Sequence, residues 1–454
     1  MSAGPTPSFV PRPSGLVLSA FRALRYDPAV AGPLSALTSP PYDVVDADGV
    51  TTLERASDHN VVRLILPRED VGAGQDRYAS AARLLEAWRA EGAMVADATP
   101  ALYVYEQAAP ALQDRAVGDA GSVRPGHVQR GLLGALSLSP AEDGVVLPHE
   151  NTITRAVDDR LALYTAVGAD LEPIFLVYDG GGAATRAVAS VDQVGASGPA
   201  LLVDAVLADG LRHRLWAITD PSVLAEVAED LAPRSALIAD GHHRYATYLR
   251  RQAERHEAGD GPGPWDAGLC LLVDATSFGP EVHPIHRYVP GIGVAELARR
   301  TAAGASVRLV DGDLALALEQ LAAAGAEGPA FLLASGDGRE LHLVTEPDAA
   351  QLAAAVPEGH SAAWAALDVS VLHALLVVAL WGLPDDVDHV AYEHDVAGAL
   401  ASAARSGGTA VLLNPTPVQA VAAVAAAGER MPRKSTLFTP KPSTGLVVRD
   451  HRDA

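Results

Sequence analysis

Short apolar runs alternate with longer amphipathic segments along most of this 454-residue chain. The short runs are rich in β-branched and aromatic residues, so they predict strands. These strands are expected at residues 16–18, 60–66, 101–106, 129–138, 173–178, 213–218 and 237–239. The longer segments carry apolar residues on one helical face, and they predict helices at residues 80–91, 150–167, 221–232 and 246–256. This mixture indicates an α/β or α+β protein.

Changes in composition divide the chain into five segments. Residues 1–14 are rich in Pro, Ser and Gly, and they predict a flexible N-terminus. Residues 15–180 are expected to form an N-terminal α/β part, and residues 181–290 a core around the motif DGHHRY. Residues 291–365 are Ala-rich and carry few charges, so they predict an inserted subdomain. Residues 366–454 return to dense motifs, and we expect them to come back to the active site.

The net charge of −22 narrows the range of partners. Nucleic acids and anionic membranes are bound through clustered Lys and Arg, so neither is expected here. A basic pocket inside an acidic protein would instead select a small anion. The single cysteine, Cys270, rules out an intrachain disulfide, and the longest apolar stretch, residues 369–382, is too short to cross a bilayer. We expect a cytoplasmic protein that binds small molecules, as a monomer or a homo-oligomer.

The basic residues are strongly biased, since the chain has 32 arginines and only two lysines. Both lysines, Lys434 and Lys441, lie in one Pro-rich segment that also contains Ser435 and Thr436. An ammonium is compact and mobile in a way that a guanidinium is not, and neighbouring hydroxyls can hold phosphate oxygens. The segment therefore predicts a phosphate-binding loop, although it lacks the glycines of a nucleotide-binding P-loop. A solvated basic loop is the alternative.

The sequence Asp240-Gly241-His242-His243-Arg244 is the strongest indication of a binding site. It follows an apolar strand and opens a helix, and the N-terminus of a helix attracts anions. Gly241 lets the backbone approach an anion closely, while the two histidines and the arginine add positive charge. We interpret the motif as an anion site. Metal binding by the two histidines and a capped helix with surface histidines are the alternatives.

Carboxylates suited to acid–base chemistry occur in three places. Asp43 follows two prolines, Glu150 stands beside His149 before a helix, and Asp240 ends a strand. Such a group can accept a proton, or bind Mg²⁺ together with water. A helix cap is the alternative for His149 and Glu150. Two further cations could help to neutralise an anion from other segments: Arg63 and Arg287.

Several motifs occur in order along the chain: FRALRYDP, PPYDVV, NVVRLILP, LPHENT, IADGHHRYAT, HPIHRYV, NPTPV and MPRKSTLFTPKPSTGLV. Together, over residues 21–447, they resemble the family known as domain of unknown function 1015. The DGHHRY motif at the mouth of a helix also resembles the phosphate-binding motif of the ParB/sulfiredoxin-like fold.

This resemblance implies both a fold and an activity. The fold would be a ParB/sulfiredoxin-like core with added strands and helices. The activity would be that of a free serine kinase, which transfers a phosphoryl group from pyrophosphate, or from ADP or ATP, to L-serine. The product, O-phosphoserine, would serve cysteine biosynthesis, and Mg²⁺ is the expected cofactor. Asp240, His242, His243 and Arg244 match the phosphate-binding signature. A phosphate-ester or pyrophosphate hydrolase and a ParB-like nucleotide-binding regulator are the alternatives.

Overall fold

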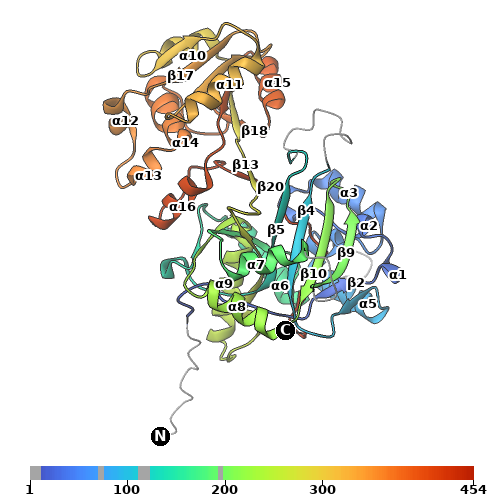
Figure 1. Cartoon of the computed structure of the whole chain (residues 1–454). Helices are drawn as coiled ribbons and strands as arrows, with labels where there is room; N and C mark the ends of the chain where they lie inside the picture. Colours follow the sequence, from blue (N-terminus) through green and yellow to red (C-terminus); the bar gives the residue numbers. More distant parts are fainter. Residues whose placement is uncertain (1–11, 70–75, 111–122, 193–197, 454) are drawn as a thin grey trace. The chain divides into compact units, whose positions relative to one another are not determined.

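The chain folds into two compact units (Figure 1). The computed structural model describes residues 12–69, 76–110, 123–192 and 198–453, so most of the N-terminal segment expected to be flexible lies outside the described residues. The first unit contains the described residues up to Pro280 and those from Pro440 onward. The second contains Glu281–Thr439. It is therefore wider than the insertion expected at residues 291–365. Of the segment 366–454, which was expected to return to the active site, only the part from Pro440 onward belongs to the first unit.

A mixed sheet forms the centre of the first unit. Its described strands run in the order β6-β11-β8-β12-β5-β4-β10-β9, and β1 pairs with β5 outside this path. The β6–β11 and β8–β12 pairs are parallel, and the remaining pairs are antiparallel. The strands are β1 (Leu18–Ser19), β4 (Leu102–Ala108), β5 (Val128–Ser137), β6 (Val146–Leu147), β8 (Ile174–Tyr178), β9 (Ala200–Val206), β10 (Arg212–Ile218), β11 (Ala236–Asp240) and β12 (Ala267–Asp274).

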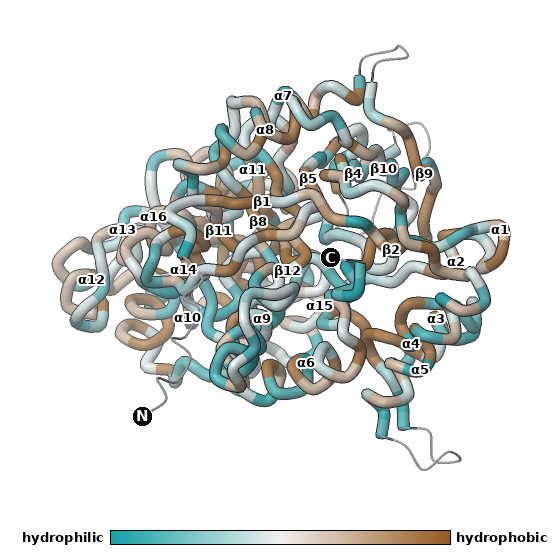
Figure 2. Tube along the Cα trace, turned by 90° about the horizontal axis from the view of Figure 1, so that it is seen from below, coloured by the Kyte–Doolittle hydropathy of each residue, from teal (hydrophilic) through white to brown (hydrophobic). Residues whose placement is uncertain are grey.

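Helices cover both faces of this sheet, as Figure 2 shows for α7 and α8 on one side and α6 and α9 on the other. Strands buried on both faces lose the alternation of apolar and polar residues, which explains the continuous apolar sequence of β8 and β12. Helix α6 packs against both α5 and α9. The helices are α5 (Arg77–Ala90), α6 (Thr154–Val167), α7 (Ala183–Ala189), α8 (Pro221–Leu231) and α9 (His242–Glu257).

The C-terminal segment is embedded in the first unit. Thr444 pairs with Ser39 and Val448 with Leu24 in isolated bridges, and β21 (Arg449–Asp450) pairs with β7 (Ala169–Asp170). The fully buried Asp170 binds the side chains of Arg251, Arg449 and His451 at 2.9, 2.9 and 3.0 Å. A buried carboxylate needs such compensation, so these pairs hold the end of the chain against the rest of the first unit.

The second unit has an antiparallel sheet in the order β15-β17-β16-β19-β14-β18. Phe331 and Leu333 of β16 join one apolar core, while Leu332 and Ala334 join another on the opposite face. Helices therefore cover this sheet on both sides as well. Its strands are β14 (His286–Val289), β15 (Ser306–Leu309), β16 (Phe331–Ser335), β17 (Leu341–Thr345), β18 (Ala391–Glu393) and β19 (Thr409–Leu413). The hairpin β16–β17 occupies part of the expected insertion.

Two sequence-based expectations are wrong. Residues 60–66 do not form a strand, because α4 (Val62–Ile65) occupies them and the Asn60 side chain accepts the Val62 N–H at 2.9 Å. The helix expected from residue 150 begins only at Thr154, which leaves Glu150–Ile153 as an extended connection. Over the described ranges, no helix is both long and apolar enough to span a bilayer.

Candidate active site

The candidate site begins where β11 ends and α9 starts. Asp240 is the last residue of β11, Gly241 follows, and His242 opens a 16-residue helix. Gly241 has φ = 94°, a left-handed conformation that residues with a Cβ rarely adopt. A Cβ at this position would also lie 3.1 Å from the guanidinium of Arg244. The glycine is therefore required both by the turn and by the side chain that packs beneath it.

Asp240 binds two cations. Its Oδ1 lies 2.5 Å from Lys441 Nζ, and its Oδ2 accepts a hydrogen bond from Arg244 Nη2. Burial by itself raises the pKa of the Asp240 carboxyl, but Lys441 and Arg244 outweigh burial, so the pKa lies below its ordinary value. Asp240 is consequently a fixed negative charge at neutral pH and a weak base.

Arg244 lies inside the protein. It is 1% exposed, and its Nη1 donates to the carbonyl oxygen of Pro173 while Nη2 binds Asp240. Burial lowers the pKa of Arg244, but the carboxylates of Asp240 and Glu172 reverse this effect and leave the pKa above its ordinary value. The sequence assigned this guanidinium to phosphate binding. Its contacts instead give it the task of holding Asp240 and the turn in place.

Lys441 joins a second carboxylate to the site. Its Nζ lies 3.8 Å from Oδ2 of Asp43, which belongs to the 3₁₀ turn η1 (Tyr42–Val44). Asp43 is about one-third exposed, and Lys441 is mostly buried. Although burial lowers the pKa of the Lys441 ammonium, Asp240 and Asp43 raise it above its ordinary value. The ammonium is therefore charged and lies between carboxylates from η1 and β11.

The two histidines of α9 are covered by the connection that precedes α6. The backbone N–H of His149 donates to Nε2 of His242 at 3.2 Å, and that of Ile153 donates to Nε2 of His243 at 3.0 Å. A ring nitrogen that accepts a hydrogen bond carries no proton, so each neutral ring has its proton on Nδ1. Burial also lowers the pKa of His243. These histidines therefore do not supply the positive charge expected from the sequence.

Glu150 lies at the same corner. Its Oε2 is 3.8 Å from Nδ1 of His242, and its side chain is 39% exposed. The extended connection found in place of the first helical turn thus brings Glu150 to the start of α9. Asp43, Glu150, the DGHHR turn and Lys441 come from four separate stretches of sequence, and all of them belong to the first unit.

Glu172 was not singled out from the sequence. It is fully buried, and its Oε1 accepts hydrogen bonds from the Tyr42 N–H at 3.0 Å and from Thr444 Oγ1 at 3.3 Å. Burial raises its pKa, although Arg244 and Arg160 act in the opposite direction. Glu172 thereby connects η1, which carries Asp43, to the segment that carries Lys441. In the sequence, the only feature that could have indicated Glu172 is its position, as an acidic residue just before the apolar run that forms β8.

Most of the other predicted phosphate ligands belong to the second unit. Arg63 donates to the carbonyl oxygen of Glu54 at 2.7 Å and pairs with Asp58 at 3.3 Å. Neither of these partners belongs to the site described above. Four of the predicted residues belong to the second unit: Arg287, Lys434, Ser435 and Thr436. Within that unit Arg287 is 1% exposed and donates to the Lys434 carbonyl oxygen at 2.9 Å. The Arg287 side chain therefore supports, from inside the second unit, the loop that contains Lys434.

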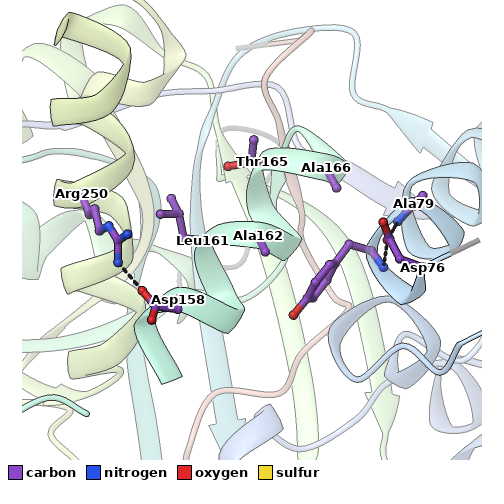
Figure 3. Close-up of a pocket in the computed structure, with 9 residues that line it drawn as sticks. Asp76, Ala79, Asp158, Leu161, Ala162, Thr165, Ala166 and Arg250 are labelled. Atoms are coloured by element: carbon purple, nitrogen blue, oxygen red, sulfur yellow. Dashed lines mark hydrogen bonds and ion pairs between the residues drawn. The ribbon is translucent and has the colours of Figure 1, made fainter. Parts of the chain in front are cut away.

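A groove of about 610 Å³ lies between α5, α6 and α9 (Figure 3). Its lining residues are Asp76, Tyr78, Ala79, Asp158, Leu161, Ala162, Thr165, Ala166 and Arg250. Figure 3 shows Arg250 of α9 paired with Asp158 of α6 at one side. None of the carboxylates or cations predicted from the sequence lines this groove. It is therefore distinct from the cluster around Lys441.

The side chains of the site determine whether it could bind a metal ion. Across the described stretches of the chain, no three His, Cys, Asp or Glu side chains are grouped closely enough to hold a metal ion. Mg²⁺ in enzymes that use phosphate is commonly bound by one or two carboxylates together with the phosphates of the substrate. The partly exposed Asp43 fits that role, whereas Asp240 is already bound to two cations.

Comparisons with known proteins identify the family. The model of the family described as protein of unknown function DUF1015 matches residues 18–370, and the chain belongs to this family. This confirms the resemblance that the ordered motifs indicated. No curated protein matches the chain.

Similar solved structures share a low identity with the chain. A free serine kinase in complex with AMP is 14% identical, with 74% of this chain and 95% of that chain covered and a TM-score of 0.33. A C-terminally truncated SbnI from Staphylococcus aureus is 11% identical, with 70% and 87% covered and a TM-score of 0.33. A conserved hypothetical protein from Pyrococcus furiosus is 14% identical, with 68% and 94% covered and a TM-score of 0.31.

Proposed function

We propose that the chain is a phosphotransferase that moves a phosphoryl group from a small donor to the hydroxyl of free L-serine. The arrangement that carries this proposal is the Lys441 ammonium, 2.5 Å from Asp240 and 3.8 Å from Asp43, beside the N-terminus of α9. Phosphoryl transfer depends mainly on positioning and on neutralising charge, which this arrangement can supply. The choice of serine rests on the family motifs, and the DGHHR turn fits a ParB/sulfiredoxin-like core.

Lys441 and the first turn of α9 would hold the donor phosphates. The dipole of a long helix favours anions at its N-terminus, and a charged lysine adds a point charge there. The net charge of −22 favours a small anion over a polyanion as the ligand. Pyrophosphate, ADP and ATP are the candidate donors, and the small size of pyrophosphate suits a site whose charged lysine is mostly buried.

Glu150 is the better candidate for the general base. It is 39% exposed beside His242, whereas Asp240 is held by two cations. In the transfer, the serine oxygen forms a bond to phosphorus and the bridging P–O bond of the donor breaks. The hydroxyl proton passes to the carboxylate, and the leaving phosphate keeps the electron pair of the broken bond. Asp43 would hold Mg²⁺, which neutralises charge on the phosphate oxygens when bound.

Phosphorus NMR tests this proposal. The purified protein is incubated with L-serine and Mg²⁺, and with pyrophosphate, ADP or ATP in separate samples. We expect the signal of O-phosphoserine with at least one donor, and none without serine. Release of phosphate at the same rate with and without serine would establish a hydrolase instead. The absence of turnover with all three donors would contradict the proposal.

A further inference from the structure

A row of polar side chains crosses one face of the sheet of the first unit. Gln129 of β5, Gln107 of β4 and His213 of β10 are directly opposite one another in the strand register. Residues in register on neighbouring strands share a face, and each of these three is at most 1% exposed. Buried polar groups are costly unless they are hydrogen-bonded, so the partners of this row indicate its purpose.

The two glutamines bind the main chain next to the site lysine. Gln107 Nε2 donates to the carbonyl oxygen of Lys441 at 2.9 Å. Gln129 Nε2 donates to the carbonyl oxygen of Pro440 at 3.1 Å and to Oε1 of Gln107 at 2.9 Å. The amide of Gln107 is thereby fixed in orientation, and two consecutive carbonyl groups of the C-terminal segment are held.

Tyr105 binds the same segment on the other side of the lysine. The Ser443 N–H donates to the Tyr105 hydroxyl oxygen at 3.3 Å, and Tyr105 lies 2.7 Å from Nδ1 of His213. His213 Nε2 is 3.0 Å from both carboxylate oxygens of Asp209. A carboxylate can only accept, so Nε2 of His213 donates to Asp209, and Nδ1 of a neutral His213 ring accepts from the Tyr105 hydroxyl. The Tyr105 oxygen in turn accepts the Ser443 N–H.

We propose that Gln107 and Tyr105 are positioning residues that set the place of the Lys441 ammonium by holding the main chain on both sides of it. Lys441 has a flexible four-carbon side chain, and its pairing with Asp240 and Asp43 depends on where its backbone is anchored. The proposal rests on the proposed function only for its effect on catalysis. The anchoring itself is a property of the fold.

The two lysines of the chain allow a direct test. Protein labelled with ¹³C at lysine Cε gives two lysine signals by NMR, and Lys434→Arg leaves only that of Lys441. We expect the Gln107→Met and Tyr105→Phe variants, singly and together, to move this signal toward its position in Asp240→Asn.

Tyr103→Phe is the matched control. Tyr103 is a buried tyrosine of the same strand, and its hydroxyl binds Ala23, Phe21 and Asp97 rather than the C-terminal segment. It should lower the melting temperature and leave the Lys441 signal in place. An unchanged Lys441 signal in folded Gln107→Met and Tyr105→Phe would overturn the proposal. This readout needs no turnover, so a protein inactive toward serine would refute the proposed function without affecting this result.

Discussion

The ammonium of Lys441, which is mostly buried, and the buried carboxylate of Asp240 form an ion pair with an N–O distance of 2.5 Å. The pair connects the last segment of the chain to the end of β11 and to the DGHHR turn. Because Asp240 also binds Arg244, the carboxylate is stabilised from inside the protein and from the side of the proposed substrate. The two cations therefore have different proposed tasks: Arg244 supports the carboxylate from inside, and we propose that Lys441 binds a phosphate.

Arg244→Ala is expected to destabilise the protein strongly. The change leaves Asp240 and Glu172 with less compensation in a buried setting, and breaking such a pair costs about 3–5 kcal/mol. Thermal or chemical unfolding measures the effect. Arg250→Ala on the same helix is the control, because its ion pairs with Asp158 and Glu254 are at the surface and should contribute little. Equal losses in the two variants would refute the supporting role of Arg244.

Gly241→Ala tests the turn. Both Gly241 and Gly259 have left-handed φ angles, 94° and 87°, so alanine introduces strain of about 1–3 kcal/mol at either position. Only at Gly241 does the new Cβ approach another side chain, the Arg244 guanidinium at 3.1 Å. We therefore expect Gly241→Ala to be the more destabilising change and to reduce activity. If Gly259→Ala lowers stability and activity as much as Gly241→Ala does, the contact between the new Cβ and Arg244 does not explain the effect.

Asp368 is expected to make the stability of the second unit depend on pH. It opens α14 (Asp368–Val371), and burial raises its pKa to about 7 from an ordinary value near 3.8. The folded state therefore keeps a proton that the unfolded state loses above about pH 4, and the favourable contribution declines as the pH rises to about 7.

Asp368→Asn cannot ionise and should remove this dependence. We expect it to leave stability nearly unchanged at pH 4 and to increase it at pH 8, by up to about 4 kcal/mol. Denaturant unfolding of both proteins at the two pH values provides the measurement. A variant that is less stable than the wild type at pH 8 would contradict the assignment of a protonated Asp368.

Sequence reasoning was most successful where a local pattern determines the structure. The apolar run before Asp240, the glycine and the amphipathic segment after it correctly predicted the strand, turn and helix of β11 and α9. The strand predicted from Asn60 to Leu66 was wrong, because a short apolar run fits a buried strand and a buried helical turn equally well. There the Asn60 side chain accepts the N–H of Val62, the first residue of α4.

Contacts between residues far apart in the chain could not be predicted from the sequence. Lys434 and Lys441 stand in one motif, yet the first belongs to the second unit and the second to the first unit, because the chain passes from one to the other after Thr439. The extent of the second unit depends on the pairing of β14 with β19, which no local pattern encodes. For the same reason Arg244 was expected to face a ligand, and only its contacts with Pro173 and Asp240 reveal its inward direction.

The most direct test of the account is whether residues from separate stretches of the chain act in one reaction. Mass spectrometry would quantify O-phosphoserine made by Asp43→Asn, Glu150→Gln and Lys441→Ala, with Arg250→Ala as the control and melting temperatures recorded for each. We predict that each of the three loses about 100-fold or more of the wild-type activity while remaining folded, and that the control does not. Full activity in folded Lys441→Ala, or no phosphoserine from the wild type with any of the three donors, would contradict it.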